Sequence, residues 1–293
     1  MEHASGKVLA SLDNGVGLLT FNQPEKRNAM SVEMWDGLAA VLGAWADDPA
    51  VRAVVLTGAG DKAFVSGADI SEFGARRDSA AAQREYDATT RRGRDALAAF
   101  QKPVIARIQG FCLGGGLGIA MQADLRVAAE GSSFGIPAAR LGIVYGFDAT
   151  RRLVSLVGQS RARLMLFTGE RIDAAEALRI GLVDRVVPAG DLHASVEALA
   201  QGIAANAPLS VRAEKRLPAA IGCGRSDGLG LNTSRTVAGI GAFSDCPSNC
   251  ANLRYVRRGT SPMRCSVISA SHAKSCSSVM PGSLSLKSVQ AGL

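Results

Sequence analysis

The chain has 293 residues, of which 47% are hydrophobic and 20% charged, a composition that suits a globular protein with one large core. No apolar run reaches the ~18 residues that a membrane span requires, and the N-terminus lacks the pattern of a secretory signal, so we expect a cytoplasmic protein with no membrane partner. The net charge of +7 lies almost entirely in residues 217–293, which hold eight Lys or Arg and two Asp or Glu, so the charge does not indicate a nucleic-acid partner.

The N-terminal part of the chain begins with a hairpin pattern. Residues 7–22 alternate as two strands around Asn14-Gly15, a pair typical of a tight hairpin turn. Ser31 then precedes apolar residues at helical spacing as far as Trp45, which predicts a helix capped by Ser31. Residues 51–57 are mostly apolar, as in a strand covered on both faces.

Strand and helix patterns alternate from there on. They predict helices over 78–100, from Gly114 to about 123, over 149–157, 173–180 and 190–206, and strands over 103–108, 124–129 and 181–188. This alternation predicts an α/β fold. Because pairs of strands precede helices, repeated ββα units fit better than a plain doubly wound sheet.

The pattern changes near Leu217. Residues 217–293 hold fourteen Ser and every cysteine except Cys112, and they show no sustained period. We therefore predict a domain over residues 1–216, followed by an atypical Ser/Arg/Cys-rich tail over 217–293 that is disordered or poorly packed. The cysteines and histidines lack metal-ligand spacing, so we expect no metal site.

Two glycine-containing loops each follow a predicted buried strand: residues 62–70 and the triplet Gly114–Gly116. Glycines at the start of a helix allow backbone N–H groups to point at an anion, and two such loops could hold one carbonyl oxygen. The same glycines would also serve close packing of a helix on a strand. Local chemistry leaves both interpretations open.

Other motifs fit the chain less well. No phosphate-binding or dinucleotide-binding glycine pattern is present. Residues 131–135 match GxSxG, which raises a serine hydrolase with Ser133 and His193, but Ile136-Pro137 stands where that motif requires a helix. Since the other histidines lie near the chain ends, acid–base chemistry would fall to carboxylates or tyrosine.

Seven motifs in order are the basis of a family resemblance: NQPEKRNAM (22–30), GADI (67–70), GFCLGGG (110–116), ADLRVA (123–128), FGIP (134–137), LFTG (166–169) and AAEALRIGLV (174–183). Over about residues 5–216 the chain resembles the crotonase superfamily, the enoyl-CoA hydratase/isomerase family. The resemblance implies a spiral of ββα units with a helical C-terminal region. It implies an enzyme of fatty acid metabolism, a lyase or isomerase, that stabilises a thioester enolate.

The resemblance also assigns residues. The backbone N–H groups of Ala68 and Gly115 would form the oxyanion hole. Coenzyme A would arrive as part of the acyl-CoA substrate, with no separate cofactor, and the chains would form homotrimers or homohexamers. The expected substrate-binding residues are Lys26, Arg27, Ala29, Gly67, Asp69, Ile70, Gly114 and Ala138.

The chain departs from the family where its two hydratase glutamates stand. Those positions are Gly118 and Ala138, so hydration by a glutamate pair is unsupported. Tyr145 and Asp148 are the remaining acid–base candidates; Tyr145 resembles the methylmalonyl-CoA decarboxylase branch, and would otherwise be pocket wall. Asp148 would otherwise cap a helix.

Two further alternatives stay open. The chain could be a catalytically silent acyl-CoA binder. Its tail could also be an out-of-frame product, since the pattern is lost abruptly near Leu217.

Overall fold

The computed structural model describes residues 1–69 and 80–223, all of which belong to the unit Met1–Leu229. They form a seven-stranded and a four-stranded sheet. The larger sheet has the order β1 (Glu2–His3), β2 (Val8–Asp13), β3 (Val16–Phe21), β4 (Ala53–Gly58), β6 (Val104–Ile108), β8 (Leu125–Ala129) and β11 (Arg185–Val187). The smaller has the order β10 (Arg171–Asp173), β9 (Ser133–Gly135), β7 (Phe111–Leu113) and β5 (Ala63–Val65).

The chain order shows how the two sheets are built. Strands β4, β6 and β8 are parallel neighbours in the larger sheet, and each is followed at once by a short strand of the smaller sheet, β5, β7 and β9. A helix comes after each pair. The predicted α/β fold of repeated ββα units is therefore confirmed.

The N-terminal elements also match their sequence patterns. Asn14 and Gly15 have φ of 46° and 85°, as a tight turn between β2 and β3 requires. Helix α1 (Val32–Ala46) begins after Ser31, whose Oγ accepts a hydrogen bond from the Met34 N–H at 3.3 Å.

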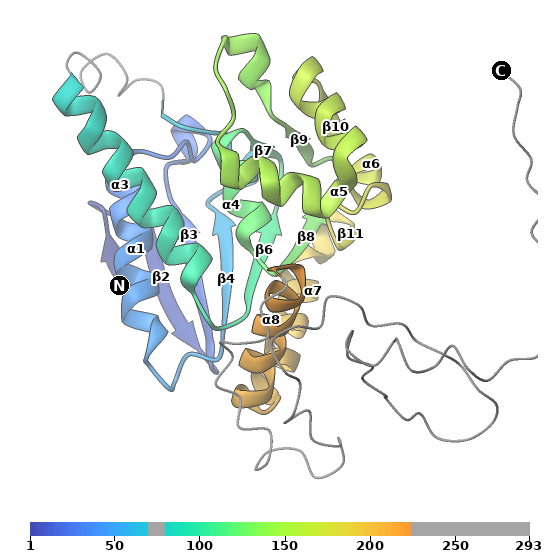
Figure 1. Cartoon of the computed structure of the whole chain (residues 1–293). Helices are drawn as coiled ribbons and strands as arrows, with labels where there is room; N and C mark the ends of the chain where they lie inside the picture. Colours follow the sequence, from blue (N-terminus) through green and yellow to red (C-terminus); the bar gives the residue numbers. More distant parts are fainter. Residues whose placement is uncertain (70–79, 224–293) are drawn as a thin grey trace, which may run out of the picture. The chain divides into compact units, whose positions relative to one another are not determined.

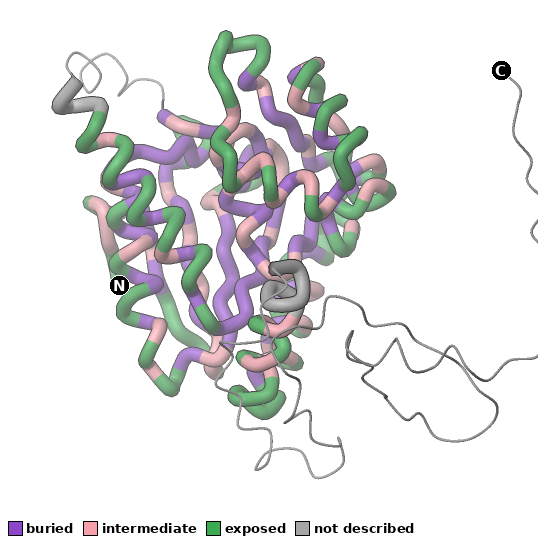
Figure 2. The backbone as a smooth tube through the Cα atoms, viewed as in Figure 1, coloured by how far each residue is buried: buried purple, intermediate pink, exposed green. Residues whose placement is uncertain are grey.

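Helices cover both faces of the larger sheet (Figure 1). Along β4, Val54 and Leu56 join the core on one face, whereas Val55 packs on the other face with residues of α7 (Leu192–Ala205). The first face carries α1, α4 (Gly115–Gln122) and the smaller sheet. Figure 2 shows the result: the central strands are buried, and the helices expose their outer sides.

Helix α3 (Ala80–Ala99) lies beside α1. A methyl group on Gly93 would come within 2.7 Å of the Trp35 ring, so only glycine permits this close approach. The packing of α3 on α1 fixes where the residues of α3 lie relative to α4.

The C-terminal helices differ in extent from the predictions. The segment α5 (Phe147–Thr168) consists of two helical pieces that meet at a kink at Gly158, whose φ of 76° and ψ of 164° are not helical. The predicted helix over 149–157 corresponds to the first piece, and the second piece was not predicted. Helix α6 (Ala174–Arg179) is capped by Asp173. Helix α8 (Pro208–Cys223) crosses the predicted domain boundary, and the rest of the tail lies outside the described residues. The described part of the chain also has the 3-10 turns η1 (Pro24–Lys26), η3 (Pro137–Leu141) and η4 (Ala189–Asp191).

Among the described helices, none has the length and apolar character that crossing a membrane would require.

Candidate active site

Two loops that follow β5 and β7 meet at the N-terminus of α4. The Met30 N–H donates to the Gly67 carbonyl at 2.8 Å, and the Asp69 N–H donates to the Met30 carbonyl at 2.9 Å. These bonds leave Ala68 between them, and its N–H donates to no group within residues 1–69 and 80–223. Gly115 is the first residue of α4, so its N–H has no partner in the helix.

The two amides lie close together. A methyl group on Gly115 would lie 3.8 Å from the Ala68 nitrogen. The structure thus brings Ala68 and Gly115 together, with Gly67 (φ 127°) and Gly114 (φ 50°) shaping the two loops in conformations that favour glycine. Two unpaired N–H groups in this arrangement can bind one oxygen atom that carries negative charge.

The glycine triplet has three different structural roles. Gly114 adopts φ 50° and ψ −116°, which a side chain disfavours. Gly116 packs on β5, since a methyl group there would lie 2.0 Å from the Val65 carbonyl oxygen. Gly115 has neither constraint: its φ is not positive, and an added methyl group would meet nothing closer than 3.8 Å. Close packing therefore explains Gly116 and leaves Gly115 for another role.

Tyr145 reaches into the same site from the segment before α5. Its hydroxyl donates to the Gly114 carbonyl at 2.9 Å. A methyl group on Gly118 would lie 3.1 Å from that hydroxyl oxygen. The hydroxyl thus lies where a side chain at position 118 would begin.

Burial of the hydroxyl raises the pKa of Tyr145 far above its ordinary value. The nearby Cys112 adds to this pKa shift, and the Arg94 charge opposes it. At neutral pH Tyr145 is therefore a neutral hydrogen-bond donor.

Asp148 lies in the first turn of α5, but Gly146 holds the N-cap position. The interpretation of Asp148 as the cap was therefore wrong. Its side chain is 80% exposed, and its carboxylate lies 3.6 Å from the Arg151 guanidinium. Among the described residues, the Asp148 carboxylate thus has its ion pair with Arg151 and no contact with the Ala68 or Gly115 N–H groups.

Ala138 is buried in η3, with 6% of its surface exposed. A methyl group on Gly114 would lie 3.9 Å from Cδ of the preceding Pro137, so η3 begins beside the glycine loop. Position 138 thus belongs to the surroundings of the paired amides.

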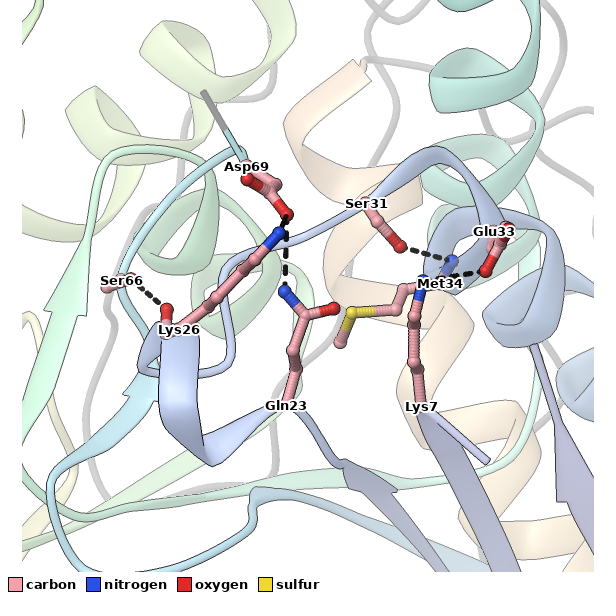
Figure 3. Close-up of polar contacts among 8 residues, drawn as sticks. All are labelled: Lys7, Gln23, Lys26, Ser31, Glu33, Met34, Ser66 and Asp69. Carbon is pink, nitrogen blue, oxygen red and sulfur yellow. Dashed lines mark hydrogen bonds and ion pairs between the residues drawn. The ribbon is translucent and has the colours of Figure 1, made fainter. Parts of the chain in front are cut away.

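Lys26 and Asp69 form an ion pair (Figure 3). The Lys26 Nζ lies 2.7 Å from Asp69 Oδ2, and Gln23 Nε2 donates to the same oxygen at 3.2 Å. The Asp69 side chain is 5% exposed, whereas that of Lys26 is 46% exposed. This pair ties the 23–28 loop to the residue that follows Ala68. Ile70, predicted as its neighbour in the site, lies outside the described residues.

Asn28 is a positioning residue that sequence reasoning missed. Its buried side chain donates to the carbonyls of Ala59 and Ala63 at 2.9 and 2.7 Å, and accepts from the Gln23 N–H at 3.0 Å. It therefore holds the 23–28 loop against the turn before β5. An Asn in a polar loop carries no periodic signal, so the sequence pattern did not distinguish it; its backbone φ is positive, at 54°, as is that of Arg27 at 53°.

Two hollows of about 260 Å³ each adjoin the 59–63 turn. One is lined by Pro24, Arg27, Asn28 and Lys62 among others, and Ala29 follows these residues as a buried neighbour. The other is lined by Thr57, Arg107 and His193 among others. Neither hollow includes Ala68 or Gly115 in its lining. Arg27, a predicted substrate-binding residue, thus lines the first hollow.

The serine hydrolase alternative lacks its required geometry. Ser133 lies in β9, paired with β7 and β10, and no helix follows it directly. His193 contacts the Arg107 guanidinium in the second hollow. Within residues 1–69 and 80–223, no three His, Cys, Asp or Glu side chains gather as metal ligands would.

Comparison with known proteins agrees with this geometry. A family model described as enoyl-CoA hydratase/isomerase matches residues 11–220. The short-chain-enoyl-CoA hydratase of Clostridium acetobutylicum is 40% identical, covering 71% of this chain and 79% of that protein. The crotonyl-CoA hydratase of Syntrophomonas wolfei is also 40% identical, with the same coverage of both chains.

A solved structure gives the same result. The enoyl-CoA hydratase/carnithine racemase of Magnetospirillum magneticum is 36% identical with a TM-score of 0.71, covering 74% of this chain and 81% of that one. The crotonase-like fold is therefore confirmed. The chain belongs to the enoyl-CoA hydratase/isomerase family, a family of acyl-CoA-processing enzymes.

Proposed function

We propose that the protein binds an acyl-CoA thioester with its carbonyl oxygen between the N–H groups of Ala68 and Gly115, and that it stabilises the enolate formed from that thioester. The observation that carries this proposal is the pair of unused amides, with 3.8 Å between the Ala68 nitrogen and the position of a methyl group on Gly115. Negative charge on the oxygen grows as the enolate forms, so fixed donors stabilise the transition state more than the substrate.

Hydration, the reaction in the names of the relatives, has less support in this chain than thioester binding does. The positions that the family resemblance assigns to the two glutamates hold Gly118 and Ala138, and neither residue can move a proton. Tyr145 is a neutral donor with its hydroxyl on the Gly114 carbonyl, so it holds the glycine loop and does not serve as a base at neutral pH. We propose a reaction with little demand for a protein base, such as decarboxylation, in which the departing CO2 leaves the electron pair of the enolate.

The coenzyme A part would approach from the hollow beside the 23–28 loop. Arg27 and Lys62 line this hollow and supply positive charge for phosphate groups. The Lys26–Asp69 pair and the buried Asn28 hold the 23–28 loop, which carries Arg27, and Asn28 also bonds the 59–63 turn, which carries Lys62. With coenzyme A in this hollow, the thioester end of the substrate would extend toward Ala68.

A catalytically silent acyl-CoA binder is the second candidate. The absence of carboxylates at positions 118 and 138 favours it, because the paired amides bind a thioester oxygen with or without turnover.

One experiment separates the two candidates. The purified protein is incubated with crotonyl-, 3-hydroxybutyryl-, methylmalonyl-, long-chain enoyl- and aryl-CoA, and the products are identified by mass spectrometry. Turnover of at least one thioester that is lost in Gly115→Pro supports the enzyme. An unchanged panel together with thioester binding supports the silent binder, and no binding by folded protein contradicts both.

A further inference from the structure

Each of the two paired amides is one end of a peptide unit whose other end is a carbonyl group. The Ala68 N–H shares its peptide with the Gly67 carbonyl, and the Gly115 N–H shares its peptide with the Gly114 carbonyl. In the part of the chain that the structure describes, no peptide bond is cis. Because a trans peptide is planar, with its N–H and C=O pointing in opposite directions, a donor that holds the carbonyl also fixes the direction of the N–H.

Both carbonyls accept hydrogen bonds, but from different kinds of donor. The Gly67 carbonyl accepts from the Met30 N–H at 2.8 Å. The Gly114 carbonyl accepts from the Gly118 N–H at 3.0 Å and from the Tyr145 hydroxyl at 2.9 Å. Among the described residues, Tyr145 is the one side chain that bonds to either carbonyl. It can therefore be changed without altering the backbone bonds.

Tyr145 is the residue of its segment that turns toward the glycine loop. Its neighbours Val144 and Phe147 are 96% and 79% exposed, whereas Tyr145 packs half-buried against the main core. The glycine at position 118 gives its hydroxyl room, since a methyl group there would lie 3.1 Å from the hydroxyl oxygen. A longer side chain at position 118 would compete with the hydroxyl for this place. The hydrogen bond to the Gly114 carbonyl and the lack of a carboxylate at position 118 thus go together.

A hydrogen bond at one end of a peptide changes the other end. A donor on the carbonyl draws electron density toward the oxygen, which makes the N–H of the same peptide a stronger donor. The gain is roughly 10–30% per bond. Burial raises the pKa of Tyr145, so its hydroxyl keeps its proton at neutral pH and remains available for this bond.

We infer that Tyr145 is a positioning residue, which orients and strengthens the Gly115 donor through its hydrogen bond to the carbonyl of the same peptide. This inference rests on the proposed function and adds to it a side chain that sets the strength of one of the two donors. Tyr145 touches no reacting atom in this role, and it moves no proton.

The first measurement reads the peptide itself by NMR on the full chain. The Gly–Gly bonds of the sequence are Gly114-Gly115 and Gly115-Gly116. Protein made with ¹³C′,¹⁵N-glycine, in cells that do not convert glycine to serine, therefore gives one ¹³C′–¹⁵N–¹H correlation for each of these two peptides. Tyr145→Phe should move the 114–115 peak upfield in ¹³C′ and ¹H, because the carbonyl loses a donor, and should leave the 115–116 peak nearly unchanged. Tyr86→Phe, which removes a phenolic hydroxyl from α3, is the matched control and should move neither peak.

The second measurement reads the effect on the thioester. Butyryl-CoA labelled with ¹³C at the thioester carbonyl is bound to each protein, and the change in its chemical shift on binding is recorded. This downfield change should be roughly 10–30% smaller in Tyr145→Phe than in the unmodified protein. Incorporation of 3-fluorotyrosine at position 145 nearly preserves the shape and makes the hydroxyl a stronger donor, so it should enlarge the change. A role of Tyr145 in packing alone predicts no such increase.

The outcomes separate this inference from the function on which it rests. An unmoved 114–115 peak in Tyr145→Phe, or a thioester shift in the fluorinated protein no larger than that in the unmodified one, overturns the role of Tyr145 and leaves acyl-CoA binding intact. Failure of the folded, unmodified protein to bind the thioester, or to shift its carbonyl resonance, overturns the proposed function and the inference with it.

Discussion

Replacing Gly115 by proline removes one of the two amides while preserving the helix that carries it. Gly115 is the first residue of α4, a position where proline is favoured because its missing N–H has no helical partner. Gly114 has φ 50° and ψ −116°, which is the mirror image of an extended conformation and is accessible to glycine. A following proline disfavours the α region and leaves this conformation available. The fold should therefore tolerate the change.

The expected loss follows from the chemistry of an oxyanion hole. Removal of one donor costs about 3 kcal/mol of transition-state stabilisation, or roughly a hundredfold in kcat. The assay is the steady-state rate on whichever thioester the protein converts, with urea unfolding of the same samples. The unfolding free energy should change by less than about 1 kcal/mol, because no hydrogen bond of the described residues is lost.

Two neighbouring substitutions make the result specific. Gly115→Ala keeps the N–H and adds a methyl group with no contact closer than 3.8 Å, so its rate should stay within about tenfold of the unmodified protein. Gly116→Ala forces a methyl group to 2.0 Å from the Val65 carbonyl oxygen and should unfold the site. A folded Gly115→Pro protein that works at the full rate would refute the assignment of Gly115.

Three further predictions concern the support around the amides. Gly118→Ala should raise the unfolding free energy by about 0.5–1 kcal/mol in a Tyr145→Phe background but not in the unmodified protein, where the methyl group meets the hydroxyl at 3.1 Å; equal effects in a urea-unfolding double-mutant cycle would contradict this contact. Lys26→Met should lower the unfolding free energy by about 2 kcal/mol, because the buried Asp69 carboxylate loses the Lys26 charge 2.7 Å away, and Lys26→Met/Asp69→Leu should be less destabilised; an unchanged unfolding free energy in Lys26→Met would contradict a stabilising role of this ion pair. Burial raises the pKa of the Cys112 thiol above its ordinary 9.0, so the folded state keeps a proton that the unfolded state loses as the pH rises. The unfolding free energy should therefore fall by about 1.4 kcal/mol per pH unit above 9, and Cys112→Ala should lack this loss. If urea unfolding at pH 8 and pH 10 shows the same change in unfolding free energy for both proteins, the effect of Cys112 is excluded.

The central strands of the larger sheet, β2, β3, β4, β6 and β8, were predictable because they have five or six residues each, enough to show a pattern. Asn14-Gly15 and Ser31 carry local turn and cap chemistry, and the apolar strand β4 is buried on both faces. The smaller sheet was missed because β5, β7, β9 and β10 have three residues each, too few to display alternation. The predicted helix over 149–157 ends where Gly158 breaks the helical backbone, and the helical piece that follows Gly158 was missed.

The site was predictable where backbone chemistry determines it. The glycine loops alone left close packing open as an alternative; the family resemblance assigned Ala68 and Gly115, and the structure places these residues side by side. The position of the Tyr145 hydroxyl beside Gly118 depends on how the segment before α5 packs on α4, which no local pattern encodes.

The central claim is that two backbone amides polarise a thioester carbonyl, and it can be measured without turnover. An acyl-CoA labelled with ¹³C at the thioester carbonyl is bound to the protein and its chemical shift is recorded by NMR. The account predicts a downfield shift on binding to the unmodified protein, and a much smaller shift on binding to Gly115→Pro. Equal shifts in both folded proteins would contradict the role given to Ala68 and Gly115.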